Sequence, residues 1–187
     1  INVKQIKNWH TDSRGNIRHK SGQFFSVEGV RTEGAFSREV TSWDQPIFNQ
    51  KHGGILAMLA RKTNQYGVEF LLDGKSEPGD EDDIKFAPSF QATQSNINRA
   101  HGGKKTPLSD LVIKQKGAKL ICAASHNEEG ARFWKKPNQN LILLLNDPHN
   151  PETKKDHFIW ASLTQIKKLC LIDNIVNPYV KTILFMI

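Results

Sequence analysis

The chain has 187 residues, of which 37% are hydrophobic and 24% charged, a composition that excludes a disordered chain and suits a single folded domain over residues 1–187. No apolar run approaches the roughly 18 to 20 residues that cross a bilayer, so we expect no membrane partner. The formal net charge of +7 would attract a polyanion, but no nucleic-acid-binding motif is present, and a phosphorylated small molecule explains the same charge.

The N-terminal part of the chain predicts a short helix or arm followed by extended segments. Residues 1–12 have loosely spaced apolar positions, residues 17–20 are extended and basic, and residues 24–30 alternate as a strand does. Glu28 in this strand is either an inward or edge carboxylate or a solvent-facing one. Pro46 excludes a helix around it and indicates an extended or turn segment.

Two apolar runs in the middle of the chain predict a hairpin. Residues 53–62 and 66–74 are joined by the short connection Thr63-Asn64-Gln65, and residues 88–94 form a third strand-like run. Between the second and third runs lies a turn rich in Gly, Pro and Asp that includes the acidic loop 80–83. Together the three runs predict the middle of a mixed or antiparallel sheet.

The third run carries polar side chains in alternation. In a strand of period two, Gln91, Thr93 and Ser95 project from one face, while Ala92 and Gln94 project from the other. A row of amide and hydroxyl groups suits a polar ligand with many hydroxyl groups. The alternative is a stripe that only faces solvent.

The C-terminal half predicts alternating strands and helices. Residues 119–124 are compatible with a strand, and 128–136 predict a short helix, because acidic residues begin it and Lys135 and Lys136 end it. The apolar runs 141–145 and 183–187 have the length of strands. A capping-box pattern at Ser162 predicts a helix from Leu163 to about Leu171.

Both cysteines, Cys122 and Cys170, lie inside apolar segments. Neither CxxC spacing nor a His-Cys cluster is present, so we expect small buried thiols in a reducing compartment and no zinc site. The N-terminal segment has no secretory h-region. These observations predict a cytoplasmic location.

Several separated strings resemble one family, the nucleoside-diphosphate-hexose 2,3-dehydratases of deoxysugar biosynthesis. The strings cover nearly the whole chain in unchanged order, and the EPG and QATxSN elements with QPI upstream are the most specific. They are IRHKSGQFFSVEG (17–29), WDQPI (43–47), GGIL (53–56), KSEPGD (75–80), PSFQATQSN (88–96), EEGARFWKKPNQN (128–140), and WASLTQIKKL with DNIVN (160–177).

The resemblance implies a Nudix-like α/β (α+β) fold, a mixed β-sheet flanked by helices, without the Nudix metal box. It also implies a nucleotide-sugar-binding module, of which family members usually carry two in tandem and this chain holds one. The chain is then either a stand-alone module that pairs as a homodimer or an excised or decayed half. The implied substrate is dTDP-4-keto-6-deoxyglucose, from which water is removed across C2 and C3. No redox cofactor or metal is required, because the C4 ketone of the substrate acidifies the C3 hydrogen and stabilises the resulting enolate.

This reaction needs a base and an acid. Glu77, held beside Pro78-Gly79, is the favoured acid/base residue, and Lys75 either tunes its pKa or donates to the O4 oxygen. His101 and His19 are further catalytic candidates. The alternatives are a surface Glu in a turn and solvated histidines.

Substrate-binding candidates follow from the chemistry of the ligand. Cations suit the diphosphate, and Trp43 either suits thymine or the sugar or fills the core. The carboxamide and hydroxyl groups suit the sugar hydroxyls and the base, while Asn174 and Asn177 either line the pocket or cap the preceding helix. The predicted binding residues are Arg18, Trp43, Gln45, Gln91, Thr93, Ser95, Asn96, Arg132 and Asn177, with Lys20 and Arg99 as further cations.

Three other functions compete with a dehydratase. A catalytically silent dTDP-sugar-binding module is the alternative from a different class. A Nudix-type hydrolase lacks its metal box in this sequence, and a nucleic-acid binder has no motif to support it.

Overall fold

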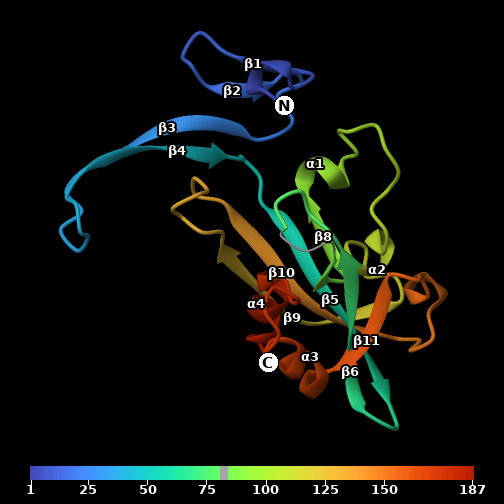
Figure 1. Ribbon diagram of the computed structural model, residues 1–187. Coiled ribbons are helices and arrows are strands. Elements are labelled where there is room, and N and C mark those ends of the chain that lie inside the picture. The colour runs from blue at the N-terminus through green and yellow to red at the C-terminus, as the bar shows by residue number, and fades with distance from the viewer. Residues whose placement is uncertain (81–83) are drawn as a thin grey trace. The chain divides into compact units, whose positions relative to one another are not determined.

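The computed structural model describes residues 1–80 and 84–187, so Glu81, Asp82 and Asp83 of the predicted acidic loop lie outside the described residues. The chain divides into two compact units. The meander unit comprises residues 1–53 and 127–137, and the sheet unit comprises residues 54–126 and 138–187. Figure 1 shows the elements of each unit.

The meander unit is a four-stranded antiparallel sheet in chain order. Its strands are β1 (Trp9–Thr11), β2 (Ile17–His19), β3 (Ser26–Thr32) and β4 (Trp43–Asn49), preceded by the 3-10 turn η1 (Val3–Gln5). The helix or arm predicted for residues 1–12 is therefore this single turn followed by a strand. Trp9, Phe25, Phe48 and Phe133 pack in sequence, with ring centroids 4.9, 5.2 and 5.6 Å apart, and supply the apolar contacts of the unit.

The predicted helix over 128–136 is wrong. The segment closes on itself by a hydrogen bond from Glu128 N to Lys136 O of 2.8 Å and by an ion pair between the two side chains of 3.4 Å. Lys135 has a φ of 45°, outside the helical region. Phe133 forms an isolated parallel bridge with Phe48 of β4. The charge pattern that suggested a helix dipole is instead an ion pair across the base of a loop.

The sheet unit holds a seven-stranded mixed sheet of order β11-β6-β5-β10-β9, in which β7 pairs with β6 and β8 pairs with β5. The predicted hairpin is confirmed, because β5 and β6 pair antiparallel up to Thr63 and Gly67. β5 pairs with β10 in parallel. The strands are β5 (Gly54–Thr63), β6 (Gly67–Lys75), β7 (Lys85–Pro88), β8 (Phe90–Thr93), β9 (Ala118–Asn127), β10 (Pro137–Leu145) and β11 (Phe158–Ser162).

Strands β7 and β8 are one extended segment that bends at Ser89 and fills the fork where β5 and β6 diverge. β7 pairs with the end of β6, from Leu72 to Lys75, and β8 pairs with the start of β5, from Gly54 to Ala57. At the bend, the buried Ser89 hydroxyl accepts a hydrogen bond from Leu59 N at 2.9 Å. The hydroxyl thus satisfies a backbone group that the fork would otherwise leave unpaired.

Each face of this sheet carries its own core, as the alternation of β5 requires. Leu56, Met58 and Ala60 point to the face packed against α3 (Leu163–Leu169) and α4 (Pro178–Leu184), which we call the α3/α4 face. Ala57 and Leu59 point to the opposite face, which is packed against α2 (Ser109–Val112). Two short elements complete the unit, α1 (Gln94–Ile97) and the 3-10 turn η2 (Pro151–Thr153).

The capping box at Ser162 is confirmed, with α3 ending at Leu169 rather than Leu171. The strand-sized run at 183–187 is not a strand. Ile183 is fully buried on α4, which begins at Pro178 behind the N-cap Asn177. No helix within the described residues is long and apolar enough to cross a membrane.

Candidate functional site

Polar side chains gather on the α3/α4 face where β5 and β10 begin and β8 ends. Phe90 and Ala92 of β8 belong to the core of the opposite face, so Gln91 and Thr93 point to the α3/α4 face. This confirms the predicted alternation at these two residues and at Ala92. Gln91 lies opposite Leu56 of β5, and Thr93 lies opposite Gly54.

The next strand continues the polar row with two buried asparagines. Asn140 lies beside Leu56 in the parallel register of β10 and β5, and Ile142, two residues further, belongs to the α3/α4 core. Asn138 and Asn140 therefore face the same side as Ile142, and they are only 4% and 1% exposed. We call Gln91, Thr93, Gly54, Asn138 and Asn140 the polar floor.

The two asparagines are held in fixed orientations. Asn138 Oδ1 accepts a hydrogen bond from Gly54 N at 2.8 Å, and Asn140 Nδ2 donates to Asn138 O at 3.2 Å. A Cβ atom at position 54 would lie 2.9 Å from Ala92 O and 3.4 Å from Asn138 Oδ1. The close approach of these strands therefore requires glycine at position 54. Because glycine has no side chain, only backbone atoms lie at the centre of the polar floor.

One buried polar atom of this floor and one beside it have no hydrogen-bond partner in the part of the chain that the structure describes. They are Asn140 Oδ1 and Nδ1 of His126, which lies on β9, the neighbour of β10. The hydrogen bond from Glu128 N to Lys136 O continues the pairing of β9 with β10 and sets His126 across from Asn138, so His126 projects from the same face as Asn138. An unpaired buried acceptor costs free energy, and native proteins retain such groups chiefly where a ligand, ion or water completes them.

A charged group adjoins the floor through Gln91. The Gln91 carboxamide accepts from Lys75 Nζ at 2.9 Å and donates to Glu77 Oε1 at 3.1 Å. Lys75 and Glu77 also form an ion pair of 3.1 Å, with side chains 29% and 38% exposed. The structure thus brings together three of the predicted site residues, which lie 14 and 16 residues apart along the chain.

Asp80 stabilises the turn that contains Glu77 by hydrogen bonds to the Glu77 backbone. Its Oδ2 accepts from Glu77 N at 2.9 Å, and its own backbone N donates to Glu77 O at 2.9 Å. The hydrogen bond from Lys85, followed by the bond from Glu77 N, lowers the pKa of Asp80. Asp80 therefore remains ionised and fixes the backbone beside the acid/base candidate.

Burial raises the pKa of Asp73 on β6, against the attraction of His157 and Lys75. The His157 ring lies 3.8 Å from the Asp73 carboxylate. Asp73 is thus a second carboxyl group close to Lys75, the last residue of β6. No set of three or more His, Cys, Asp or Glu side chains among residues 1–80 and 84–187 is arranged to hold a metal ion.

The remaining predicted residues of QATQSN do not continue the strand. The chain turns into α1 at Gln94, so Ser95 and Asn96 are helical, and the prediction that Ser95 and Gln94 alternate on a strand is wrong. Thr93 is the N-cap and accepts from Asn96 N at 3.4 Å, which explains why the strand ends there. The Ser95 hydroxyl nevertheless lies 2.8 Å from the Thr93 hydroxyl, at the edge of the floor.

Two other sequence candidates in the sheet unit have local contacts. His101 is exposed, and its Nδ1 accepts from Gly103 N at 2.8 Å. The Asn177 side chain accepts from Tyr179 N at 2.9 Å and caps α4, the helix that follows it. The prediction that Asn177 caps the preceding helix is therefore wrong, because it caps the helix that follows.

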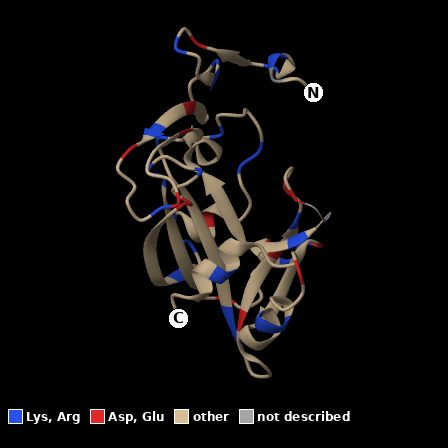
Figure 2. Cartoon of the chain, turned by 60° about the vertical axis from the view of Figure 1, so that its left-hand side comes forward, with Lys and Arg blue, Asp and Glu red and all other residues tan. Residues whose placement is uncertain are grey.

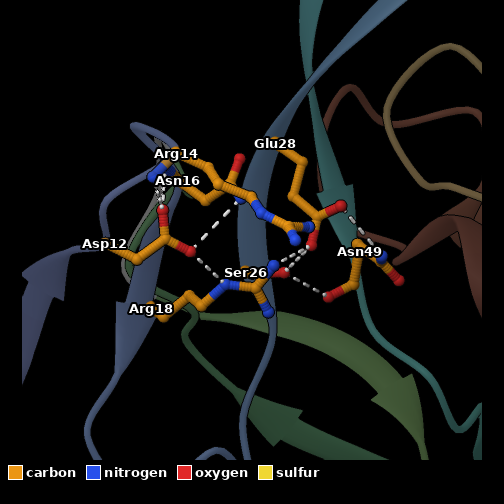
Figure 3. Close-up of polar contacts among 7 residues, drawn as sticks. All are labelled: Asp12, Arg14, Asn16, Arg18, Ser26, Glu28 and Asn49. Carbon is orange, nitrogen blue, oxygen red and sulfur yellow. Dashed lines mark hydrogen bonds and ion pairs between the residues drawn. The ribbon is translucent and has the colours of Figure 1, made fainter.

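Arg18, a predicted phosphate ligand, lies in an ion-pair cluster of the meander unit (Figure 3). Its Nε donates to Asp12 Oδ2 and its Nη2 to Glu28 Oε1, both at 2.8 Å. The Ser26 hydroxyl, 2.6 Å from Glu28, together with Asn49 and Arg18, lowers the pKa of Glu28 against its desolvation. The guanidinium therefore serves the cohesion of β2, β3 and β4.

Asp12 anchors the other end of this cluster. Desolvation alone would raise the pKa of Asp12, but hydrogen bonds from Asn16 N, from the Arg18 side chain and from Arg14 N lower it to about 2. The same bonds order the turn between β1 and β2, as Figure 3 shows.

Trp43, Gln45 and Arg132 are connected within the meander unit. Trp43 Nε1 donates to Gln45 Oε1 at 2.7 Å, and Gln45 Nε2 donates to Ala131 O at 2.7 Å, next to the exposed Arg132. His19 packs edge-on against Trp9 and Phe24, with its Nδ1 2.8 Å from the Ser21 hydroxyl. Figure 2 marks Lys and Arg positions along the backbone of both units.

Asn138, Asn140, His126 and Asp80 were missed from the sequence. The alternation of 138 and 140 with Ile142 was available, because the polar residues precede the apolar run LILLL in the same period. His126 and Asp80 had no local signal, since their importance depends on which strand or turn lies beside them.

Comparisons with known proteins give one consistent result. The family model "NDP-hexose 2,3-dehydratase" matches residues 1–187. Relatives described as dTDP-4-dehydro-6-deoxy-alpha-D-glucopyranose 2,3-dehydratase are 32% identical to the chain. The protein of Saccharopolyspora spinosa matches over 187 residues, 98% of this chain and 37% of its own length. That of Amycolatopsis orientalis matches over 184 residues, 94% and 37%, and that of Streptomyces violaceoruber over 185 residues, 97% and 40%. The chain thus spans well under half the length of these relatives.

Proposed function

Because the chain belongs to the NDP-hexose 2,3-dehydratase family, we propose that it is a hydro-lyase of deoxysugar biosynthesis that acts on dTDP-4-keto-6-deoxyglucose. The reaction removes water across C2 and C3 and leaves a 3,4-diketo-2,6-dideoxy sugar. The observation that supports this best is the polar floor, whose buried amide acceptor Asn140 Oδ1 lacks a partner while Glu77 and Lys75 adjoin the floor through Gln91.

The floor suits the hexose. Gln91 and Thr93 on one side of Gly54, and Asn138 and Asn140 on the other, present amide and hydroxyl groups on a single face. Neutral donors and acceptors match ring hydroxyls without the desolvation cost of burying a charge. Ser95 and Asn96 extend the proposed contacts at the end of β8.

Glu77 and Lys75 supply the proton chemistry in this proposal. A carboxylate can remove the C3 proton, and an ammonium can donate to O4 as negative charge develops there. The Asp80 turn restrains Glu77, which favours a positioned base over a freely rotating surface carboxylate. His101 and His19 remain proposals for a catalytic role, to be tested by single substitutions.

The nucleotide contacts are also proposals. Arg132 is exposed and has donors suited to a diphosphate, and Trp43, held by Gln45, suits stacking. Arg18 is the weaker proposal, because its guanidinium already donates to two carboxylates. Asn177 retains a proposed ligand contact in addition to its capping bond. Equilibrium binding of thymidine diphosphate to single alanine variants tests each residue.

We propose a Nudix-like arrangement, a single module, a homodimer and a cytoplasmic location. A mixed sheet with helices on both faces supports the first. The strongly exposed Leu171 and Phe185 support pairing, which light scattering would measure. The free thiols of Cys122 and Cys170 support a reducing compartment.

The experiment is incubation with dTDP-4-keto-6-deoxyglucose, followed by reductive trapping of the unstable product and mass spectrometry. Loss of one water is expected, with a hydrogen from the solvent incorporated at C2, where the enol intermediate is protonated as the C3 ketone forms. Recovery of unchanged substrate at high protein concentration would refute catalysis by this chain. Saturable binding without turnover would favour a silent dTDP-sugar-binding module.

A further inference from the structure

We infer that Asn140 and His126 together bind one ring hydroxyl of the hexose and so determine which pattern of ring hydroxyls the site accepts. This inference rests on the proposed function, because it names the part of the substrate that the polar floor recognises. It adds His126, which no motif of the sequence indicated, to the site.

Asn140 supplies the first half of the argument. Its Nδ2 is committed to Asn138 O at 3.2 Å, which directs Oδ1 the other way as a pure acceptor. The residue is 1% exposed, and Oδ1 has no partner among the described residues. A buried amide oxygen without a donor is costly, so its partner must be a group that enters the structure from outside.

His126 supplies the second half. It lies on β9, directly beside β10 in the sheet, and projects from the same face as Asn140. His126 lies across from Asn138 and is therefore the diagonal neighbour of Asn140. Diagonal neighbours on one face are about 7–8 Å apart, a separation at which aromatic and long side chains can contact a common small group. Its Nδ1 is likewise buried without a partner in the described chain. Two unpaired atoms on neighbouring strands point to one shared ligand group.

The chemistry of the two atoms selects the class of this group. The partner of Asn140 Oδ1 must donate, which excludes a carboxylate or a phosphate oxygen. A hydroxyl donates one hydrogen and accepts another, so it satisfies Oδ1 and also Nδ1 in either tautomer. An ammonium group would bury a charge with no carboxylate in the polar floor to neutralise it. A neutral hydroxyl is therefore the best match, and a hexose carries several.

The test is calorimetric binding of dTDP-glucose, which lacks the C4 ketone and so does not eliminate water, against its 2-deoxy and 3-deoxy counterparts. Thymidine diphosphate alone measures the nucleotide contribution. We expect wild-type protein to bind one of the two deoxy ligands about tenfold more weakly, the effect of about one lost hydrogen bond to a buried group. Equal affinities for all three sugars would overturn the inference.

Variants assign the discrimination to the pair. Asn140→Leu and His126→Phe are each expected to reduce the tenfold preference to less than about twofold and to leave the affinity for thymidine diphosphate unchanged. Gln139→Leu and Ser125→Phe are matched controls, because these exposed neighbours point to the other face. A preference that persists in both variants, or variants that change only thermal stability, would show that the pair holds a water molecule and would overturn the inference.

The outcomes also separate this inference from the proposed function. Wild-type protein that dehydrates dTDP-4-keto-6-deoxyglucose but does not discriminate between the sugars refutes the hydroxyl pair alone. Wild-type protein that neither turns over this substrate nor binds dTDP-glucose refutes both. If Asn140→Leu does not fold, the wild-type ligand series and the half-buried His126→Phe variant still decide the question.

Discussion

Replacing Asn138 by alanine should destabilise the sheet unit because the buried backbone N–H of Gly54 loses its hydrogen-bond acceptor. Asn138 Oδ1 accepts the hydrogen bond of Gly54 N at 2.8 Å, and both residues are buried. Alanine removes the acceptor, and the tight packing of Gly54 against Ala92 O leaves little room for a replacement water. The buried N–H then loses its partner without regaining solvent.

The expected cost is about 1–3 kcal/mol, the penalty for an unsatisfied buried donor. For a folding unit of this size, each kcal/mol lowers Tm by about 3–5 °C, so the expected decrease is about 3–15 °C. The bond between Asn140 Nδ2 and the backbone oxygen of residue 138 persists, because alanine retains that oxygen.

Differential scanning calorimetry measures the effect, and hydrogen exchange at the Gly54 amide locates it. Gln139→Ala is the matched control, an exposed residue on the same strand, and should leave Tm within about 1 °C. Equal melting of Asn138→Ala and Gln139→Ala, with no faster exchange at Gly54, would refute the reasoning.

Three further predictions address the site, the meander unit and the C-terminal helix. Glu77→Gln should lower turnover of dTDP-4-keto-6-deoxyglucose by about 10²–10⁴-fold in the product-trapping assay, whereas Glu152→Gln, an exposed loop change, should not; equal rates would exclude Glu77 as the base. Because the folded-state pKa of Asp12 is lowered to about 2, its stabilisation is present above pH 4 and is lost as the pH falls toward 2, so Asp12→Asn should flatten the acid limb of a near-UV circular dichroism titration; an unchanged limb would contradict this. Ile183→Ala should cost about 2–5 kcal/mol in urea unfolding because the side chain is fully buried, and Phe185→Ala, 90% exposed, should cost little; comparable losses would disprove the position of this helix in the core.

Sequence patterns correctly predicted those elements that are determined by residues close together in the chain. The hairpin of β5 and β6 and the capping box at Ser162 depend on neighbouring residues, and both were found. The error over 128–136 arose because Glu128 and Lys136 are placed as a helix dipole would place them, whereas they pair across a loop. The Asn177-Pro178 start of α4 was visible, but the apolar ending was interpreted as a strand.

The site was predicted only as far as one strand shows it. Gln91 and Thr93 were predicted from alternation within residues 88–94, and Lys75 and Glu77 from the family resemblance of the string KSEPGD. Asn140 and His126 become part of the same surface only through the parallel pairing of β5 and β10 and the adjacency of β9. Strand order is a long-range property that periodicity within a single segment does not encode.

Because the chain bends at Ser89, the number of residues after the bend determines the face of the sheet from which Gln91 and Thr93 project. Insertion of a single residue between Ser89 and Gln91 would leave the pairing of β7 with β6 in place but would rotate β8 by one position against β5. Gln91 and Thr93 would then exchange faces with Phe90 and Ala92. The Gln91 carboxamide would project from the α2 face of the sheet and would no longer bond to Lys75 and Glu77. Among active relatives, insertions and deletions within residues 90–93 should therefore be rarer than substitutions there. The length of this segment is then a sequence marker for relatives in which the polar floor is intact.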